Sequence, residues 1–318
     1  MQESAPEDPK KKTKLKPLLI GGAVIGVAEI LRRLFLRLQL FVPERRPIRS
    51  WNPADYGIPE ERVSELWIDT DDGEILYAWY VCAAEPIASI LFCHGNTGNV
   101  TFAADIIPHL VDANLNVLLF DYRGFGRSTG SAYPDGVVSD ALAAARFHDS
   151  IRPASLPSIL YGYSLGGAIA AQVAGAHPFD ALILQSTFTN VADMAKMMFP
   201  ALPLHVLAGK TFDTRAAMRS LRLPLLIIHG NDDEVCPIWM GRLLYDDAPA
   251  PKRFVSVEDG LHKDLFIRDA DGLIFSIEDF VRSVPIRPQT ETRAAHSSVS
   301  DSIKRRWRRF RRDRGSRR

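Results

Sequence analysis

The segment Ser158–Ala170, SILYGYSLGGAIA, constrains the fold more than any other stretch of the chain. A short apolar run leads into Gly162-Tyr163-Ser164-Leu165-Gly166, and small residues follow it. We predict a strand, a sharp turn and a helix, because Gly162 and Gly166 let the turn approach neighbouring backbone closely. Ser164 is then pushed out of the fold beside a helix N-terminus, whose unpaired N–H groups carry partial positive charge. This serine is the candidate nucleophile.

Strand-like segments recur along the chain and are separated by helical stretches such as Asp140–Phe147 and Ala168–Ala176. The first two strands are joined by a hairpin turn at Asp71-Asp72-Gly73. This alternation predicts a mostly parallel, doubly wound sheet whose ligands bind at the carboxyl ends of the strands. The predicted strands are Leu66–Asp69, Ile75–Val81, Ser89–Cys93, Val117–Asp121, Ile159–Tyr163, Leu182–Gln185, Leu225–His229 and Arg253–Val257.

The loop after the third strand, Cys93–Asn99, reads CHGNTGN. Its glycines let backbone amides turn outward, so the N–H groups of Asn96 and Leu165 are predicted to be the two donors of an oxyanion hole. We interpret His94 as a buried histidine that orients this loop rather than as a base.

A second glycine-rich loop, Asp121–Gly130 (DYRGFGRSTG), follows the fourth strand. Its spacing is GxGxxxG rather than the dinucleotide pattern GxGxxG, and the chain contains no GxxxxGK[ST] sequence. These observations argue against a nucleotide site. We expect Asp121 and Arg123 to pair and to brace the turn at the candidate nucleophile.

Two further loops supply an acid and a base. The acidic run Asp232-Asp233-Glu234 follows one strand, and His262 follows the last strand. The order serine, acid, histidine suits a triad in which the histidine takes the serine proton and the acid fixes the histidine tautomer. The chemistry of the residues alone does not separate Asp232 from Asp233.

These motifs together resemble the α/β-hydrolase superfamily, and they are most similar to membrane-attached α/β-hydrolase-domain proteins that include protein depalmitoylases. The resemblance runs from about Leu66 to Val284. It implies an α/β fold with a mostly parallel eight-stranded sheet, helices on both faces and a short lid at about 190–223. It also implies a Ser164–His262–Asp233 triad without metal or cofactor. The motifs that carry the resemblance are GYSLG at Gly162–Gly166, HGNTGN at His94–Asn99, DYRGFG at Asp121–Gly126, HGNDDEV at His229–Val235 and GLHKD at Gly260–Asp264.

The expected lid contains an apolar stretch that has two interpretations. It either receives an acyl chain or packs on the core. Its members are Met194, Met197, Met198, Phe199 and Leu202.

The net charge of +1 conceals a strong asymmetry. Residues 304–318 hold ten basic residues and one acidic residue, and residues 1–49 hold eleven basic and five acidic residues. Residues 50–303 hold 18 basic and 32 acidic residues. We therefore divide the chain into a membrane-attachment segment at 1–45, a hydrolase domain at 46–285 and a basic tail at 286–318.

The apolar run Leu18–Ala28 has eleven residues, fewer than the roughly twenty that span a bilayer. Extended to Val42, it is long enough but includes Glu29 and three arginines. We expect it to attach to a membrane, either as a transmembrane helix or lying flat on the surface.

The basic tail places Ile303, Trp307 and Phe310 on one face of a possible helix, with arginines around them. This pattern favours an anionic membrane surface, although arginine runs also bind nucleic acid. The membrane interpretation suits both ends of the chain. It favours a cytoplasmic catalytic domain, with a periplasmic or extracellular domain as the alternative.

The motifs favour a serine hydrolase that cleaves carboxylic esters or thioesters of acyl or lipid type through an acyl-enzyme. One alternative is a peptidase of the acylaminoacyl type, and another is a catalytically silent, membrane-docked interaction module. The three cysteines, Cys82, Cys93 and Cys236, show no CxxC spacing, which argues against a zinc site or a full disulfide framework.

Overall fold

A computed structural model describes residues 29–30, 32–249 and 251–285 of the 318-residue chain. The apolar run Leu18–Ala28 and the tail with Ile303, Trp307 and Phe310 lie outside the described residues. Among the described residues, no helix combines the length and the apolar character needed to cross a bilayer.

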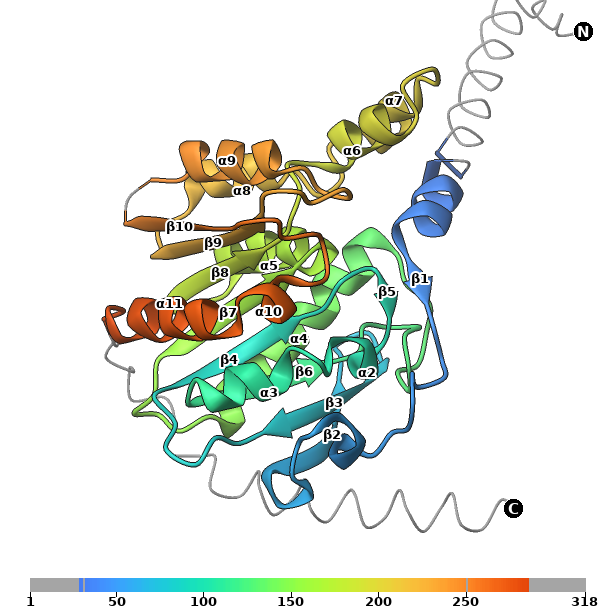
Figure 1. Cartoon of the computed structure of the whole chain (residues 1–318). Coiled ribbons are helices and arrows are strands. Elements are labelled where there is room, and N and C mark those ends of the chain that lie inside the picture. Colours follow the sequence, from blue (N-terminus) through green and yellow to red (C-terminus); the bar gives the residue numbers. More distant parts are fainter. Residues whose placement is uncertain (1–28, 31, 250, 286–318) are drawn as a thin grey trace, which may run out of the picture.

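The centre of the fold is an eight-stranded sheet with the order β10-β9-β8-β7-β4-β6-β3-β2 (Figure 1). β2 and β3 form an antiparallel hairpin, β3 also runs antiparallel to β6, and the remaining pairs are parallel. All eight predicted strands are confirmed, with ends that differ by three residues or fewer. Their bounds are β2 Val63–Asp69, β3 Ile75–Val81, β4 Ala88–Cys93, β6 Leu115–Phe120, β7 Ser158–Tyr163, β8 Ala181–Gln185, β9 Leu225–Gly230 and β10 Lys252–Val257.

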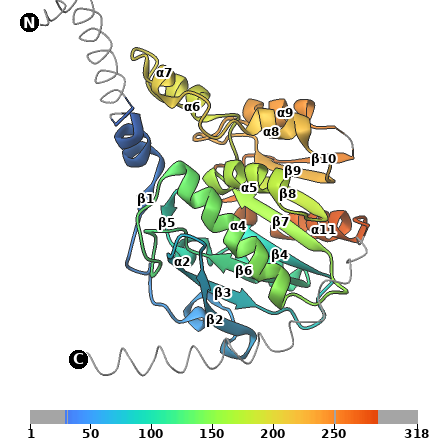
Figure 2. The same ribbon diagram turned by 180° about the vertical axis from the view of Figure 1, so that it is seen from behind.

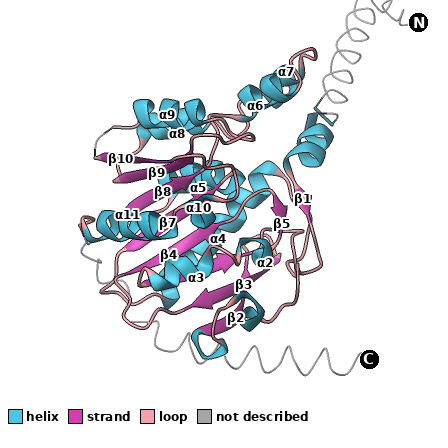
Figure 3. Ribbon diagram, in the orientation of Figure 1, coloured by secondary structure: helices cyan, strands magenta, loops and turns pink. Residues whose placement is uncertain are grey.

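Helices cover both faces of the sheet (Figures 1 and 3). α4 (Pro134–Ile151) and α5 (Leu165–Ala176) pack on one face, as Figure 2 shows from behind. α9 (Ile238–Asp247) contributes to the same core. The other core includes α3 (Ile107–Asp112), α10 (Leu265–Arg268) and α11 (Ala270–Arg282), and the short α2 (Val100–Ala103) joins it. Burial on both faces explains why the central strands are continuous apolar runs without alternation.

Residues 32–43, which belong to the segment predicted to attach to a membrane, pack on the fold. Residues 32–40 are helical, and Leu36 and Phe41 are buried in the core around α4 and α5. β1 (Val42–Pro43) then pairs in parallel with β5 (Thr97–Gly98). The chain continues through two short 3₁₀ helices, Pro53–Tyr56 and Glu60–Arg62, and reaches β2.

The segment between β8 and β9 forms the helices α6 (Val191–Met198), α7 (Leu204–Ala208) and α8 (Thr214–Ser220). α6 and α7 project away from the sheet at the end where the N-terminal helix lies (Figure 1). Met194 and Met197 pack against the core, whereas Met198 and Leu202 are exposed. The apolar stretch of the expected lid thus divides between a packed side and a solvent-facing side.

The expected pair of Asp121 and Arg123 is wrong. The buried Arg123 guanidinium instead donates two hydrogen bonds to Asp140, at 2.7 and 2.9 Å, and pairs with Asp72 at 2.7 Å. Asp121 accepts a 2.6 Å hydrogen bond from the backbone N–H of Val100, and its complete burial raises the pKa of Asp121 to about 8. Arg123 pairs with Asp140 rather than with Asp121 because the Asp140 carboxylate on α4 lies directly beside its guanidinium.

We predict that Arg123→Gln lowers the free energy of unfolding by about 3–5 kcal/mol, because the fully buried Asp140 loses its charge partner. The matched control is Arg146→Gln, which breaks an exposed ion pair with Asp71 and should cost about 1 kcal/mol or less. Urea unfolding of both variants measures the difference. Equal losses would show that the Arg123–Asp140 pair does not stabilise the fold.

Candidate active site

Ser164 lies on the turn that joins β7 to α5, and it has a positive φ of 54°. A Cβ atom at Gly162 would come within 2.5 Å of the Gly166 carbonyl oxygen, and one at Gly166 within 2.0 Å of the Cys93 carbonyl oxygen. Only glycine therefore fits at either position. The predicted strand, turn and helix are confirmed, and the turn costs on the order of 1–3 kcal/mol of backbone strain at Ser164.

The strained turn is fixed by hydrogen bonds on both sides of the serine. The Ser164 N–H donates to the Gln185 carbonyl at 2.9 Å, and the Thr187 hydroxyl donates to the Ser164 carbonyl at 2.7 Å. The end of β8 thus holds the backbone of Ser164 and leaves its hydroxyl free to face the neighbouring loops.

His262 comes from the loop between β10 and α10, and its imidazole connects the serine to an acid. Its Nδ1 lies 2.9 and 3.0 Å from the two carboxylate oxygens of Asp233. An ionised carboxylate only accepts, so Nδ1–H donates and Nε2 is left to accept from the Ser164 hydroxyl at 3.0 Å. The carboxylate therefore fixes the direction of this hydrogen-bond chain, and both Ser164 and His262 are almost fully buried.

Asp233 is the carboxylate that meets the histidine, and the exposed Asp232 is not. Its Oδ1 atom also accepts from the backbone N–H groups of Val235 and Cys236, at 2.9 and 2.7 Å. Burial raises the pKa of Asp233, but its contacts with His229 and His262 and these N–H groups outweigh burial, so the pKa lies below its ordinary value. Asp233 is therefore ionised at neutral pH and able to hold the His262 tautomer.

His229 is a site residue whose position the sequence interpretation did not identify. It is the penultimate residue of β9 and is fully buried, and its Nε2 lies 3.4 Å from Asp233 Oδ2. Nε2–H donates to the Cys236 carbonyl at 2.6 Å, which also holds the acid-bearing loop. The available signal was the His-Gly pair at the end of a buried strand, directly before the acidic run.

The loop after β4 lies against the serine. A Cβ atom at Gly95 would be 3.5 Å from the Ser164 Cβ atom, and Asn96 follows directly. Leu165 is the first residue of α5, so its N–H has no partner four residues earlier in the helix. The two predicted oxyanion donors thus belong to the two segments that flank the serine.

The N-terminal strand β1 clamps this loop from the far side. The Val42 N–H donates to the Asn96 carbonyl at 2.8 Å, and the Glu44 N–H donates to the Gly98 carbonyl at 3.1 Å. The buried Asn99 amide donates back to the Glu44 and Arg46 carbonyls at 2.9 and 2.7 Å. The position of Asn96 therefore depends on residues more than fifty positions away, which no local motif indicates.

His94 is buried, as its interpretation from the sequence required. Its Nδ1–H donates to the Gly95 carbonyl at 2.8 Å, and its ring packs against Tyr122. Burial lowers the pKa of His94 to about 4, so it is neutral at pH 7 and shapes the loop without titrating there. The described residues contain no group of three His, Cys, Asp or Glu side chains placed to hold a metal ion.

We predict that Asp233→Asn lowers kcat for ester hydrolysis by about 10⁴-fold, because the amide favours the wrong histidine tautomer. The neighbouring Asp232→Asn is the matched control and should change kcat by less than threefold, on the order of an ordinary surface substitution. Steady-state kinetics of both variants give the comparison. A larger loss in Asp232→Asn would transfer the acid to that residue.

The sequence is similar to those of several known proteins. The family described as "Serine aminopeptidase, S33" matches residues 84–214. Protein Rv2307c of Mycobacterium tuberculosis is 30% identical over 277 residues, which are 86% of this chain and 94% of that protein. The α/β-hydrolase domain-containing protein WAV2 of Arabidopsis thaliana is 30% identical over 78% of this chain and 87% of that protein. The lysophosphatidylserine lipase ABHD12 of Mus musculus is 34% identical over 55% of this chain and 49% of that protein.

The fold also matches a solved structure. The Pyrococcus furiosus esterase Pf2001 superposes with a TM-score of 0.62 at 18% identity, over 77% of this chain and 98% of the esterase. That likeness concerns the fold, whereas the similarity to WAV2 extends through the sequence over most of both chains. The chain therefore belongs to the α/β-hydrolase superfamily of serine hydrolases.

Proposed function

We propose that the protein hydrolyses carboxylic esters or thioesters of acyl or lipid type, with Ser164 as nucleophile, His262 as general base and Asp233 as the acid. The observation that carries this proposal is the continuous hydrogen-bond chain from the Ser164 hydroxyl through His262 to Asp233. The names of two similar proteins, a lipase and an esterase, support ester substrates.

In the proposed reaction, Ser164 Oγ attacks the acyl carbonyl carbon while His262 Nε2 takes the hydroxyl proton. The carbonyl oxygen becomes an oxyanion that accepts hydrogen bonds from the N–H groups of Asn96 and Leu165. The tetrahedral intermediate then breaks the ester bond, and the leaving alcohol or thiol takes the proton from His262. Water attacks the acyl-enzyme with His262 as base again, releases the carboxylic acid and restores Ser164.

Apolar side chains near the triad favour an acyl substrate. Val235 lies two residues after Asp233, Leu261 lies directly before His262, and both are partly exposed. Phe102 is exposed as well, and its ring covers Gly98 on the loop of Asn96. These exposed side chains offer contact area for a hydrocarbon chain, worth about 25 cal/mol per Å² of apolar surface buried.

The description of the matched family favours a second candidate, a serine peptidase that acts on peptide N-termini. Glu234 supports it, because its exposed carboxylate accepts the His262 backbone N–H at 3.2 Å and lies close enough to the site to attract a substrate ammonium group. The two candidates differ in the group that leaves, which is an alcohol or thiol in one case and an amine in the other.

We further propose that residues 46–285 form the hydrolase domain, with a lid at about 190–223, and that residues 1–45 and the basic tail at 286–318 attach it to a membrane. Within the N-terminal segment, residues 32–43 also pack on the domain. The acidic body between two basic ends supports this division. A bilayer attracts basic segments through its anionic lipids, which favours a cytoplasmic position for the domain.

We predict that Ser164→Ala lowers kcat for p-nitrophenyl acyl esters by about 10⁴-fold or more, leaving only what oxyanion donors and binding provide. The matched control is Ser155→Ala, an exposed serine before β7 at the opposite edge of the sheet, which should retain full activity. Unchanged turnover in Ser164→Ala would exclude Ser164 as the nucleophile. Faster cleavage of aminoacyl p-nitroanilides than of acyl esters by the unaltered protein would favour the peptidase.

A further inference from the structure

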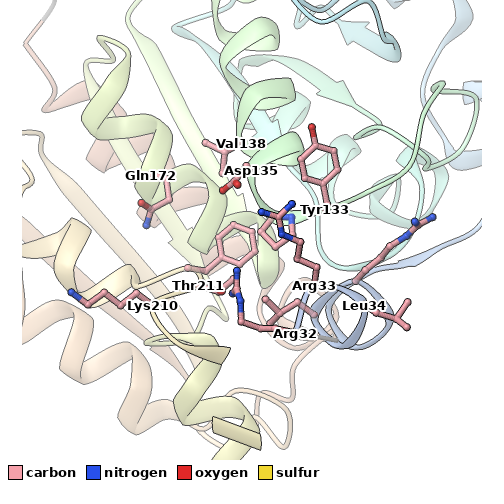
Figure 4. Close-up of a pocket in the computed structure, with 13 residues that line it drawn as sticks. Arg32, Arg33, Leu34, Tyr133, Asp135, Val138, Gln172, Lys210 and Thr211 are labelled. Carbon is pink, nitrogen blue, oxygen red and sulfur yellow. The ribbon is translucent and has the colours of Figure 1, made fainter. Parts of the chain in front are cut away.

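A cavity of about 850 Å³ opens between the N-terminal helix, the start of α4 and the base of the lid (Figure 4). Gln172, two turns along α5 from Ser164, lines it, and none of the triad residues does. Eight helical residues correspond to about 12 Å, so the cavity is separate from the candidate active site but lies near it.

The cavity is strongly basic. Arg32, Arg33, Arg37 and Lys210 line it, and Asp135 is the acid among its lining residues (Figure 4). Glu29 pairs with Arg32 and Arg33, at 2.7 and 2.8 Å, and compensates one of these charges. Within the described part of the chain, neither Arg37 nor Lys210 has a carboxylate partner. The cavity therefore keeps a positive surplus that suits a phosphate group.

Exposed apolar side chains flank this basic cavity. Ile30, Leu34 and Leu38 are spaced every four residues on the N-terminal helix and are 66%, 50% and 64% exposed, while Leu36 on another face is buried. The helix is thus apolar on two faces, of which only one packs on the protein. Beyond the base of the lid, Met198, Leu202 and Val206 are also exposed.

The sequence before the helix indicates what covers these side chains. The uncharged run Leu18–Ala28 leads directly into Glu29 and Ile30. A bilayer would accept this run and the stripe of Ile30, Leu34 and Leu38 in its apolar region, while the cations between them meet the headgroups. Soluble partners would match the apolar stripe or the basic cavity, but a surface of anionic lipid matches both at once.

We propose that the face formed by the N-terminal helix and the lid docks on a bilayer, and that the basic cavity holds the phosphate of an anionic phospholipid headgroup. The proposal goes beyond the proposed function, because it assigns a lipid site outside the triad that does not require Ser164. It would also bring the lid, and with it the candidate active site, to the surface that holds lipid esters.

The test is cosedimentation of the full-length protein with vesicles of phosphatidylcholine, alone or mixed with phosphatidylglycerol. Ser164→Ala is present throughout, so that no lipid is hydrolysed and a failed proposal for the function does not affect the result. Each base near an anionic surface contributes a factor of about five to binding, so Arg37→Gln with Lys210→Gln should weaken binding to the mixed vesicles about 25-fold. The matched control removes two exposed cations elsewhere, Arg242 on α9 and Arg282 on α11, and should change binding less than twofold, as expected for charges far from the bilayer.

A second pair of variants tests the apolar stripe. Leu34→Ser with Leu38→Ser should weaken binding to both vesicle types, whereas Ile267→Ser with Phe275→Ser, exposed on α10 and α11, should not. Equal losses in the test and control pairs, or none in either test pair, would overturn the proposal. Inorganic phosphate that raises Tm through Arg37 and Lys210, together with unchanged vesicle binding, would also overturn it and make the cavity a site for soluble phosphate. Circular dichroism confirms that each variant is folded.

Discussion

The close approach of the Ser164 turn to the loop after β4 is the constraint on which the rest of the site depends. Gly166 lies so near the Cys93 carbonyl that any side chain there would separate the two segments. This contact places the Ser164 hydroxyl, the first N–H of α5 and the loop of Asn96 around one point. The geometry follows from β4 and β7 being parallel neighbours in the sheet, because parallel neighbours end at the same edge.

The site also depends on the ionisation of the buried Asp233. Asp233 is buried, and burial alone would favour its protonated form, which could not stabilise a charged imidazole. Two backbone N–H groups, His262 and His229 reverse that preference and keep the carboxylate ionised. The balance differs at the ion pair of Arg123 and Asp140 away from the active site, where burial outweighs the contacts and raises the pKa of Asp140. Burial likewise raises the pKa of Asp121.

The parts of the fold that local patterns encode were predictable from the sequence. Apolar strands and the glycines around Ser164 are visible within a few residues, and the order of serine, acid and histidine can be read along the chain. Contacts between distant segments were not predictable from the sequence. Tertiary packing determines that β1 pairs with the Asn96 loop and that Arg123 pairs with Asp140. Asp232 and Asp233 differ only in which one the loop turns inward. The same limit applies to the segment between β8 and β9, where neighbouring methionines divide between core and solvent.

The central claim is that this arrangement activates Ser164 for covalent chemistry. Treating the folded protein with a fluorophosphonate and mapping the adduct by mass spectrometry of its peptides tests that claim most directly. The account predicts one adduct, on Ser164, formed rapidly by the unaltered protein and far more slowly by His262→Ala, since the imidazole must take the hydroxyl proton. No adduct in folded protein, or an adduct on another serine, would contradict it and would favour a protein that uses the hydrolase fold for interaction alone.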